Sequence, residues 1–141
     1  MSRQITDAEA LHLLRRQRHS FLNHLQVISG WLQLGRSERA QQYLETVAAR
    51  MTGESDVLRQ APADLSLLVL ELGLEAETHG VQLEWQLGGG GGPVRAVNDE
   101  QLVDLRRRVL GLLSAGAPGG IAIRQEDGGF SVHTPSGKGE G

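Results

Sequence analysis

The stretch that decides the fold is DAEALHLLRRQRHSFLNHLQVISGWLQL, residues 7–34. Its apolar residues recur at spacings of three and four, which predicts an amphipathic helix about 40 Å long at 1.5 Å per residue. Thr6 and Glu9 have the spacing of a capping box at the start of this helix, and Gly35 is a natural stop after its end. We therefore expect one long helix from Asp7 to Leu34.

A polar stripe follows one side of this helix. At about 100° per residue, seven polar side chains fall near the His19 direction; they are His12, Arg15, Arg16, His19, Asn23, Gln26 and Gln33. Apolar residues fill most of the remaining circumference, which is more than the stripe of roughly 100° that one neighbouring helix covers. Two hairpins around a twofold axis would cover this arc, so we expect a homodimeric four-helix bundle that leaves the polar stripe in water.

The rest of the chain divides into a second helix and a small α+β unit. Ser37 is a natural cap for the second helix, which Pro62 ends. The expected later elements are helices at 64–79 and 99–113 and strands at 81–87, 93–97, 121–124 and 130–133, with a glycine loop at 88–92. We expect a hairpin domain at residues 1–61, a second domain at 62–135 and a disordered tail at 136–141.

Composition narrows the class of protein. A net charge of −3 gives no basic footprint for nucleic acid, and the absence of cysteine removes disulfides and thiolate metal sites. No run approaches the roughly 20 apolar residues that span a bilayer, so we expect a cytoplasmic protein without a membrane partner. An aromatic content of only 4% predicts a thin monomeric core, which again favours association.

The polar stripe carries possible chemistry at His19. A neutral imidazole is nucleophilic through a ring nitrogen, and Arg15 and Arg16 lie one helical turn before it, where guanidinium groups suit phosphoryl oxygens. Asn23, one turn after it, could bind the imidazole or the phosphoryl group. A helical histidine with such neighbours is more often only part of a solvated face, so the geometry leaves both interpretations open.

The run RHSFLNHLQVISGWLQLG, residues 18–35, resembles the phosphoacceptor helix of the sporulation initiation phosphotransferase B family. Citrate/dicarboxylate-type sensor histidine kinases share its Arg-His-x-x-x-Asn-x-Leu-Gln pattern, and the similarity covers about residues 15–50. The resemblance implies that His19 is the phosphoacceptor, supported by Asn23, Arg15, Arg16 and Arg18. It also implies a mainly α fold with an α+β part: a dimeric four-helix bundle plus a small, degenerate domain like the histidine-kinase ATPase.

Three departures from those kinases argue against ATP binding. Ser20 occupies the position of an acidic residue after the histidine, residues 111–117 lack the asparagine that serves the nucleotide's magnesium, and residues 132–137 lack the glycine-rich box with its aspartate. We therefore expect a phosphorelay phosphotransferase that exchanges phosphoryl groups with response-regulator receiver domains, has no intrinsic cofactor and uses Mg²⁺ from the receiver. The alternatives are a non-catalytic scaffold or pseudokinase that binds a response regulator, and a fragment of an authentic sensor histidine kinase.

Three further features have weaker interpretations. The glycine run at 88–92 lacks the Lys-Ser/Thr of a phosphate loop and is expected to be a connector. His24 falls on the largely apolar side of its helix and is expected to be a partly buried packing residue. The basic run at 106–108 is more often a solvated face, with docking of an acidic receiver surface as the alternative.

Overall fold

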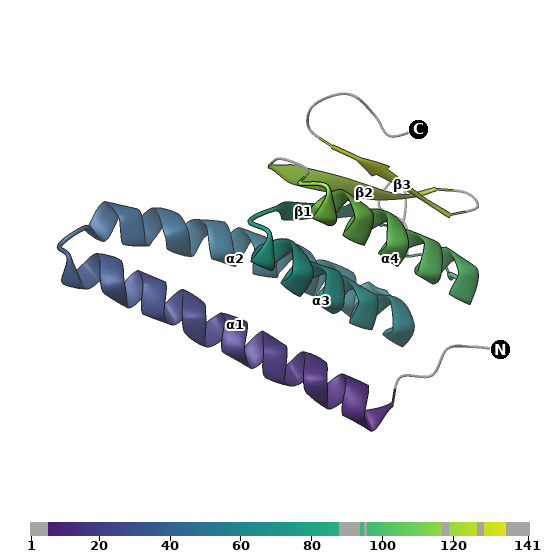
Figure 1. The fold of residues 1–141 in the computed structure, drawn as a ribbon, viewed down its shortest axis with the longest axis horizontal. Helices are drawn as coiled ribbons and strands as arrows, with labels where there is room; N and C mark the ends of the chain where they lie inside the picture. Colours follow the sequence, from purple (N-terminus) through teal and green to yellow (C-terminus); the bar gives the residue numbers. More distant parts are fainter. Residues whose placement is uncertain (1–5, 88–93, 95, 117–118, 127–128, 135–141) are drawn as a thin grey trace.

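The computed structural model describes residues 6–87, 94, 96–116, 119–126 and 129–134. Two long antiparallel helices form a hairpin, and the second leads into a two-layer unit of two helices and a sheet (Figure 1). Helix α1 covers Asp7–Gln33 and helix α2 covers Ser37–Gln60. The predicted capping box is present, with Glu9 N donating to Thr6 Oγ1 and Thr6 N donating to Glu9 Oε1, each at 3.1 Å. Gly35 has a φ of +72°, which permits the tight connection between the helices.

One capping prediction is wrong. Ser37 is the first residue of α2, and Arg36 precedes it as the cap without any side-chain hydrogen bond. Arg36 O accepts the first hydrogen bond of α2, from Ala40 N at 3.1 Å, so Arg36 occupies the capping position and Ser37 is already helical. The start of α2 is therefore set by the geometry of the turn and not by a hydroxyl cap.

The second half of the chain contains α3 at Ala63–Thr78, β1 at Gln82–Gln86, α4 at Asp99–Ser114, β2 at Gly120–Glu126 and β3 at Gly129–His133. The sheet order is β1-β2-β3, and α4 connects the parallel pair β1 and β2, while β2 and β3 are antiparallel. The strand expected at 93–97 is not formed by its described residues, since Val94, Ala96 and Val97 lie outside any strand. Val94 and Val97 instead pack against the core before Asn98 caps α4. The glycine run, residues 93 and 95, and the tail lie outside the described residues.

The hydrophobic core belongs to this second half. It lies between one face of the sheet and helices α3 and α4; fully buried members include Leu65, Val69, Leu72, Leu105, Val109, Leu113, Ile121, Ile123 and Val132. Val57, near the end of α2, is the one residue of the described hairpin in this buried cluster. The hairpin therefore has almost no core of its own within the described chain.

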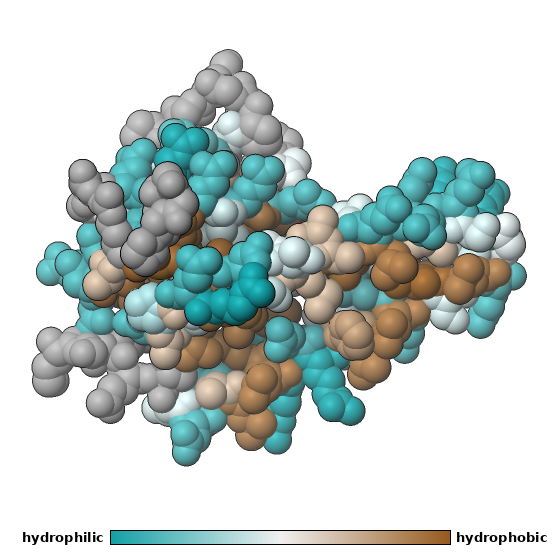
Figure 2. Space-filling view, turned by 180° about the vertical axis from the view of Figure 1, so that it is seen from behind, coloured by the Kyte–Doolittle hydropathy of each residue, from teal (hydrophilic) through white to brown (hydrophobic). Residues whose placement is uncertain are grey.

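Large apolar side chains lie exposed along the hairpin. We call the following set the apolar stripe: Leu11, Leu14, Phe21, Leu25 and Leu32 of α1 with Leu44 and Met51 of α2. Each of these residues is at least 42% exposed, and Figure 2 shows hydrophobic surface running along the hairpin between polar patches. Contiguous exposed apolar surface of this kind marks an interaction site on most proteins.

The observed fold confirms the coarse prediction of a mainly helical chain with a small α/β part. In the described ranges, none of the helices has both the length and the apolar character needed to cross a membrane. The predicted division at residues 61 and 62 falls in the connection between α2 and α3, and remains a prediction.

Candidate functional site

Helix α1 presents three different faces. Its inner face packs on α2 and α3 and consists of partly or fully buried residues; these are Ala10, Leu13, Arg16, Ser20, His24, Ile28 and Trp31. The apolar stripe lies about 100–120° away from this face, at 100° per residue. The third face, about as far again around the helix, carries His19. The wide apolar arc predicted from the sequence is thus divided between an inner face that α2 and α3 cover and a stripe that the described chain leaves open.

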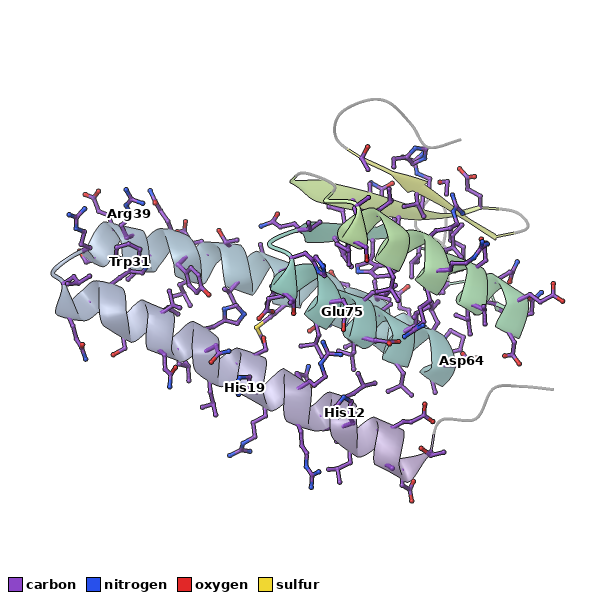
Figure 3. All side chains as sticks on the ribbon, viewed as in Figure 1. His12, His19, Trp31, Arg39, Asp64 and Glu75 are labelled. Atoms are coloured by element: carbon purple, nitrogen blue, oxygen red, sulfur yellow. The ribbon has the colours of Figure 1, made fainter. Side chains whose placement is uncertain are left out.

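His19 lies near the middle of α1 and is exposed (Figure 3). Arg15, Arg18 and Asn23 are exposed as well, and among the described residues none of these three makes a hydrogen bond or an ion pair. Their side chains are therefore available to a ligand at the surface. At 100° per residue, Arg15 and Asn23 project about 40° on either side of the His19 direction, whereas Arg18 projects about 100° away, towards the apolar stripe.

Arg16 is placed differently from its neighbours. Its Nη2 donates to Glu75 Oε2 of α3 at 2.8 Å, and both side chains are 30% exposed. Of the five residues predicted to form the site, Arg16 is thus the one that the fold directs towards the second half of the chain. The sequence placed it at the edge of the polar stripe, about 60° from His19, where it can turn either way.

A partly buried polar cluster lies on the inner face of α1, within about one and a half turns of His19 along the helix, and we call it the Glu77 cluster. The Glu77 carboxylate of α3 accepts from Ser20 Oγ at 2.5 Å and from Arg50 Nη2 at 2.8 Å, and His24 Nε2 is 3.1 Å away. His24 Nδ1 lies 2.5 Å from the Tyr43 hydroxyl. His24 Nε2 also lies 3.0 Å from Arg50 Nη2, so the ring contacts Tyr43, Glu77 and Arg50. The cluster joins α1, α2 and α3 at one point.

The charges in this cluster shift its ionisation. Burial of the Glu77 carboxyl opposes ionisation, but the hydrogen bond from Ser20, the charge of Arg50 and the contact with His24 together bring its pKa below the usual value. Burial, followed by the nearby Glu77 charge, raises the pKa of the Tyr43 hydroxyl. Glu77 is therefore a carboxylate at neutral pH, and it is paired with the Arg50 guanidinium at the point where the three helices meet.

His24 is a packing residue, as the sequence predicted, but its partners are polar. It is buried, at 8% exposed, but it packs in polar company and not only against apolar side chains. Its ring lies 5.5 Å from the Tyr43 ring, centroid to centroid. Such a histidine is a structural part of the hairpin and is not available at the surface.

A groove opens beside the Glu77 cluster between α1, α2 and α3, with a volume of about 550 Å³. Its walls are largely apolar and include members of the apolar stripe, namely Leu11, Leu14, Phe21 and Met51. Glu54 lies at its edge, where burial raises the pKa of the carboxyl and Arg50 partly offsets that effect. The groove thus includes four of the seven residues of the apolar stripe.

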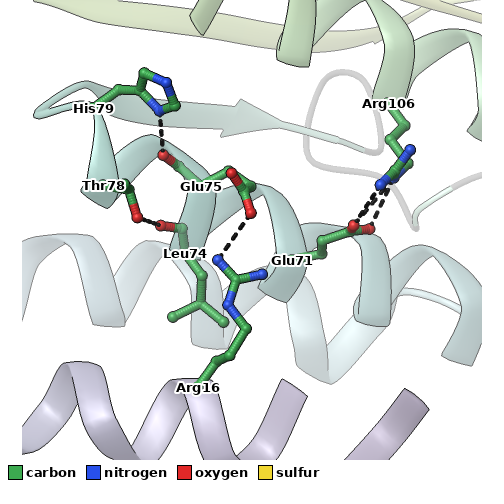
Figure 4. Close-up of polar contacts among 7 residues, drawn as sticks. All are labelled: Arg16, Glu71, Leu74, Glu75, Thr78, His79 and Arg106. Carbon is green, nitrogen blue, oxygen red and sulfur yellow. Dashed lines mark hydrogen bonds and ion pairs between the residues drawn. The ribbon is translucent and has the colours of Figure 1, made fainter. Parts of the chain in front are cut away.

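The basic run at 106–108 is engaged within the chain. Arg106 pairs with Glu71 of α3 at 2.9 Å, Arg107 pairs with Asp104, and Arg108 Nη1 donates to Phe130 O at 2.8 Å. Figure 4 shows the Arg106–Glu71 pair one turn along α3 from the Arg16–Glu75 pair. These contacts leave little free positive charge on α4 for an acidic partner, which weakens the docking alternative.

Sequence reasoning missed the acidic contribution of α3. Glu75 and Glu77 both reach α1, yet nothing in their local sequence marks them as partners of Arg16 or Ser20. The one available signal was His24, because a polar ring on the inner face of a helix needs partners when it is buried. The identity of those partners depends on how α3 packs across the hairpin.

Comparison with known proteins gives one match. Residues 1–60 match the family model described as the sensor kinase SpoOB-type, alpha-helical domain, and this range contains α1, α2 and His19. No curated protein and no solved structure matches the chain significantly. The helical hairpin is therefore similar to the alpha-helical domain of SpoOB-type sensor kinases, and this similarity suggests a two-component protein related to kinase or phosphotransfer function.

Proposed function

We propose that this protein passes phosphoryl groups between the aspartates of response-regulator receiver domains through a phosphohistidine at His19. The observation that carries the proposal is the exposure of His19 at the middle of a hairpin that matches the family model. Arg15, Arg18 and Asn23 would support the site from the same helix, with side chains that no described residue occupies.

The transfer step is a displacement at phosphorus. A ring nitrogen of His19 forms the new N–P bond as the acyl–phosphate O–P bond of the donor breaks, and the donor aspartate leaves as a carboxylate. The reverse displacement delivers the group to the second receiver. Positioning and charge stabilisation lower the barrier, with Mg²⁺ and a lysine supplied by the receiver and guanidinium groups by α1.

Transfer without ATP is favoured by the surroundings of Ser20. This residue stands where related kinases place an acidic residue, and its hydroxyl donates to Glu77 at 2.5 Å on the inner face of α1. A hydroxyl committed in this way is not a base for attack on ATP. The carboxylate that it meets serves the packing of three helices.

The working unit in this proposal is a homodimer. The apolar stripe and the adjoining groove are exposed in a single chain, and the hairpin has almost no core within the described residues. A second hairpin carrying the same stripe is self-complementary to this surface and would complete a four-helix bundle. His19, on a different face of α1, stays accessible in such a dimer.

The experiment uses the full chain and a panel of receiver domains, each phosphorylated with a small-molecule donor. The expected result is acid-labile label on His19 and its passage to a second receiver, with loss of both in His19→Gln. His12→Gln is the matched control, because His12 lies two turns earlier on the same polar stripe of α1. This variant should transfer the phosphoryl group normally. Absence of label on His19 with every receiver would refute the proposal, and an unchanged cellular effect of His19→Gln would favour the scaffold.

A further inference from the structure

Two arginine–glutamate pairs connect α3 to its neighbours, and they differ in one respect. Arg16 of α1 pairs with Glu75 and Arg106 of α4 pairs with Glu71, at 2.8 and 2.9 Å, one helical turn apart on α3 (Figure 4). Only the first pair involves a residue one turn from His19. The Arg16–Glu75 contact therefore joins the proposed phosphoacceptor helix to the second half of the chain, while the Arg106–Glu71 contact lies wholly within that half.

The Arg16–Glu75 pair is of a kind that can exchange partners. Both side chains are 30% exposed, and ion pairs open to water contribute little net free energy. The Glu77 cluster is different, since its carboxylate has three partners and His24 within it is 8% exposed. These are two polar contacts between α1 and α3. The more exposed one, the Arg16–Glu75 pair, can open while the Glu77 cluster holds the helices together. We call the Arg16–Glu75 pair the outer contact.

A phosphoryl group on His19 would compete with Glu75 for Arg16. Phosphorylation places close to two negative charges and three acceptor oxygens on the helix surface. Residues three apart on a helix are neighbours, so the Arg16 guanidinium can reach a group on His19 by rotating about its own side-chain bonds. It must leave Glu75 to do so.

We propose that Glu75 is a positioning residue that holds Arg16 away from His19 until His19 is phosphorylated. The inference rests on the proposed function and extends it, because it gives the second half of the chain a part in setting the stability of the phosphohistidine. The two equilibria are linked. Phosphorylation of His19 favours the open Arg16–Glu75 contact by the same factor as the open contact favours phosphorylation. Opening of that contact in turn favours the phosphorylated form.

The test avoids receiver domains. Phosphoramidate phosphorylates histidine directly: its P–N bond breaks, ammonia leaves, and the new N–P bond forms on the ring. The ³¹P resonance of phosphorylated His19 is identified by its absence in His19→Gln, and its shift is followed against pH. A guanidinium beside the phosphoryl group favours the dianion and lowers the midpoint of this titration.

Glu75→Gln is expected to raise the acid dissociation constant of the phosphoryl group by about two- to fivefold, the range typical of an exposed ion pair. Glu71→Gln removes the same charge from the same helix without touching α1, and should leave the constant unchanged. In an Arg16→Gln background, the effect of Glu75→Gln should disappear. Circular dichroism of each variant confirms that the fold is retained.

Two results would overturn the proposal that Glu75 holds Arg16 away from His19. One is equal behaviour of Glu75→Gln and Glu71→Gln, and the other is persistence of the Glu75→Gln effect without Arg16, which would mean a general charge effect. Neither depends on a receiver. A chain that shows the predicted titration but takes no label from any receiver would contradict the proposed function alone, so the two failures are distinguishable.

Discussion

Replacing Glu77 with alanine should weaken the fold more than any other single change on α3 that leaves the apolar core intact. The substitution removes the shared acceptor of Ser20, His24 and Arg50. Ser20 can turn to water, but the His24 and Arg50 side chains are only 10% and 20% exposed and would lose a charged partner. His24 keeps Tyr43 and Arg50 as partners, so the main cost is the Arg50 guanidinium left without its carboxylate, about 1–3 kcal/mol.

The matched control is Glu75→Ala, two residues earlier on α3. It removes one ion pair between side chains that are each 30% exposed, which is worth less than about 1 kcal/mol. Both changes replace glutamate by alanine in the same helix, so the difference in helix propensity largely cancels. The comparison therefore isolates the contribution of the Glu77 cluster.

The assay is urea unfolding followed by circular dichroism, at one fixed protein concentration because the proposed dimer makes stability depend on concentration. A double variant with Arg50→Met should recover part of the loss, since removing both partners of a buried pair costs less than removing one. If Glu77→Ala cost no more than Glu75→Ala, or Arg50→Met gave no recovery, the Glu77 cluster would not be holding the three helices together.

Three other predictions follow from the surface, the α2–α3 contact and the ionisation of Glu77. Phe21→Glu places a charge in the apolar stripe and should weaken self-association about tenfold or more in sedimentation equilibrium, whereas Val103→Glu, on an exposed apolar position of α4, should not. Gly73→Ala should raise the free energy of unfolding by up to about 1 kcal/mol in a Glu54→Ala background. In the native chain the gain should be smaller, because the new Cβ meets the Glu54 carboxylate. Equal gains in urea titrations of the two backgrounds would contradict that contact. The pKa of Glu77 is lowered in the folded chain, so its contribution is complete above the unfolded value of about 4.3 and is lost as pH falls through the lower folded value. The difference in free energy of unfolding between the native chain and Glu77→Gln should therefore become smaller below about pH 4. A difference that grew in acid would contradict a lowered pKa of Glu77.

Local signals explain why α1 could be predicted closely. Thr6 and Glu9 cap it, the apolar spacing is helical throughout, and Gly35 takes the positive φ that ends the hairpin turn. All three signals depend on residues within a few positions of one another. The sequence predicted Asp7 to Leu34, and the helix covers Asp7–Gln33.

Tertiary contacts explain what could not be predicted. The partners of Arg16 and Ser20 lie nearly 60 residues away on α3, at Glu75 and Glu77, and their register against α1 is set by packing. The stretch at 93–97 is apolar enough to predict a strand, but Val94 and Val97 pack against the core instead. The apolar pattern of residues 93–97 does not tell whether the sheet has a free edge with which they could pair.

The confinement of the core to one half of the molecule separates the two tryptophans of the chain. Trp31 lies at the far end of the hairpin, with the Arg39 guanidinium 5.7 Å from its ring centroid (Figure 3). Trp85 lies on β1 against the core. One fluorophore therefore lies in the hairpin and the other in the second half of the chain, so replacing either one lets fraying of the hairpin be followed separately from unfolding of the sheet.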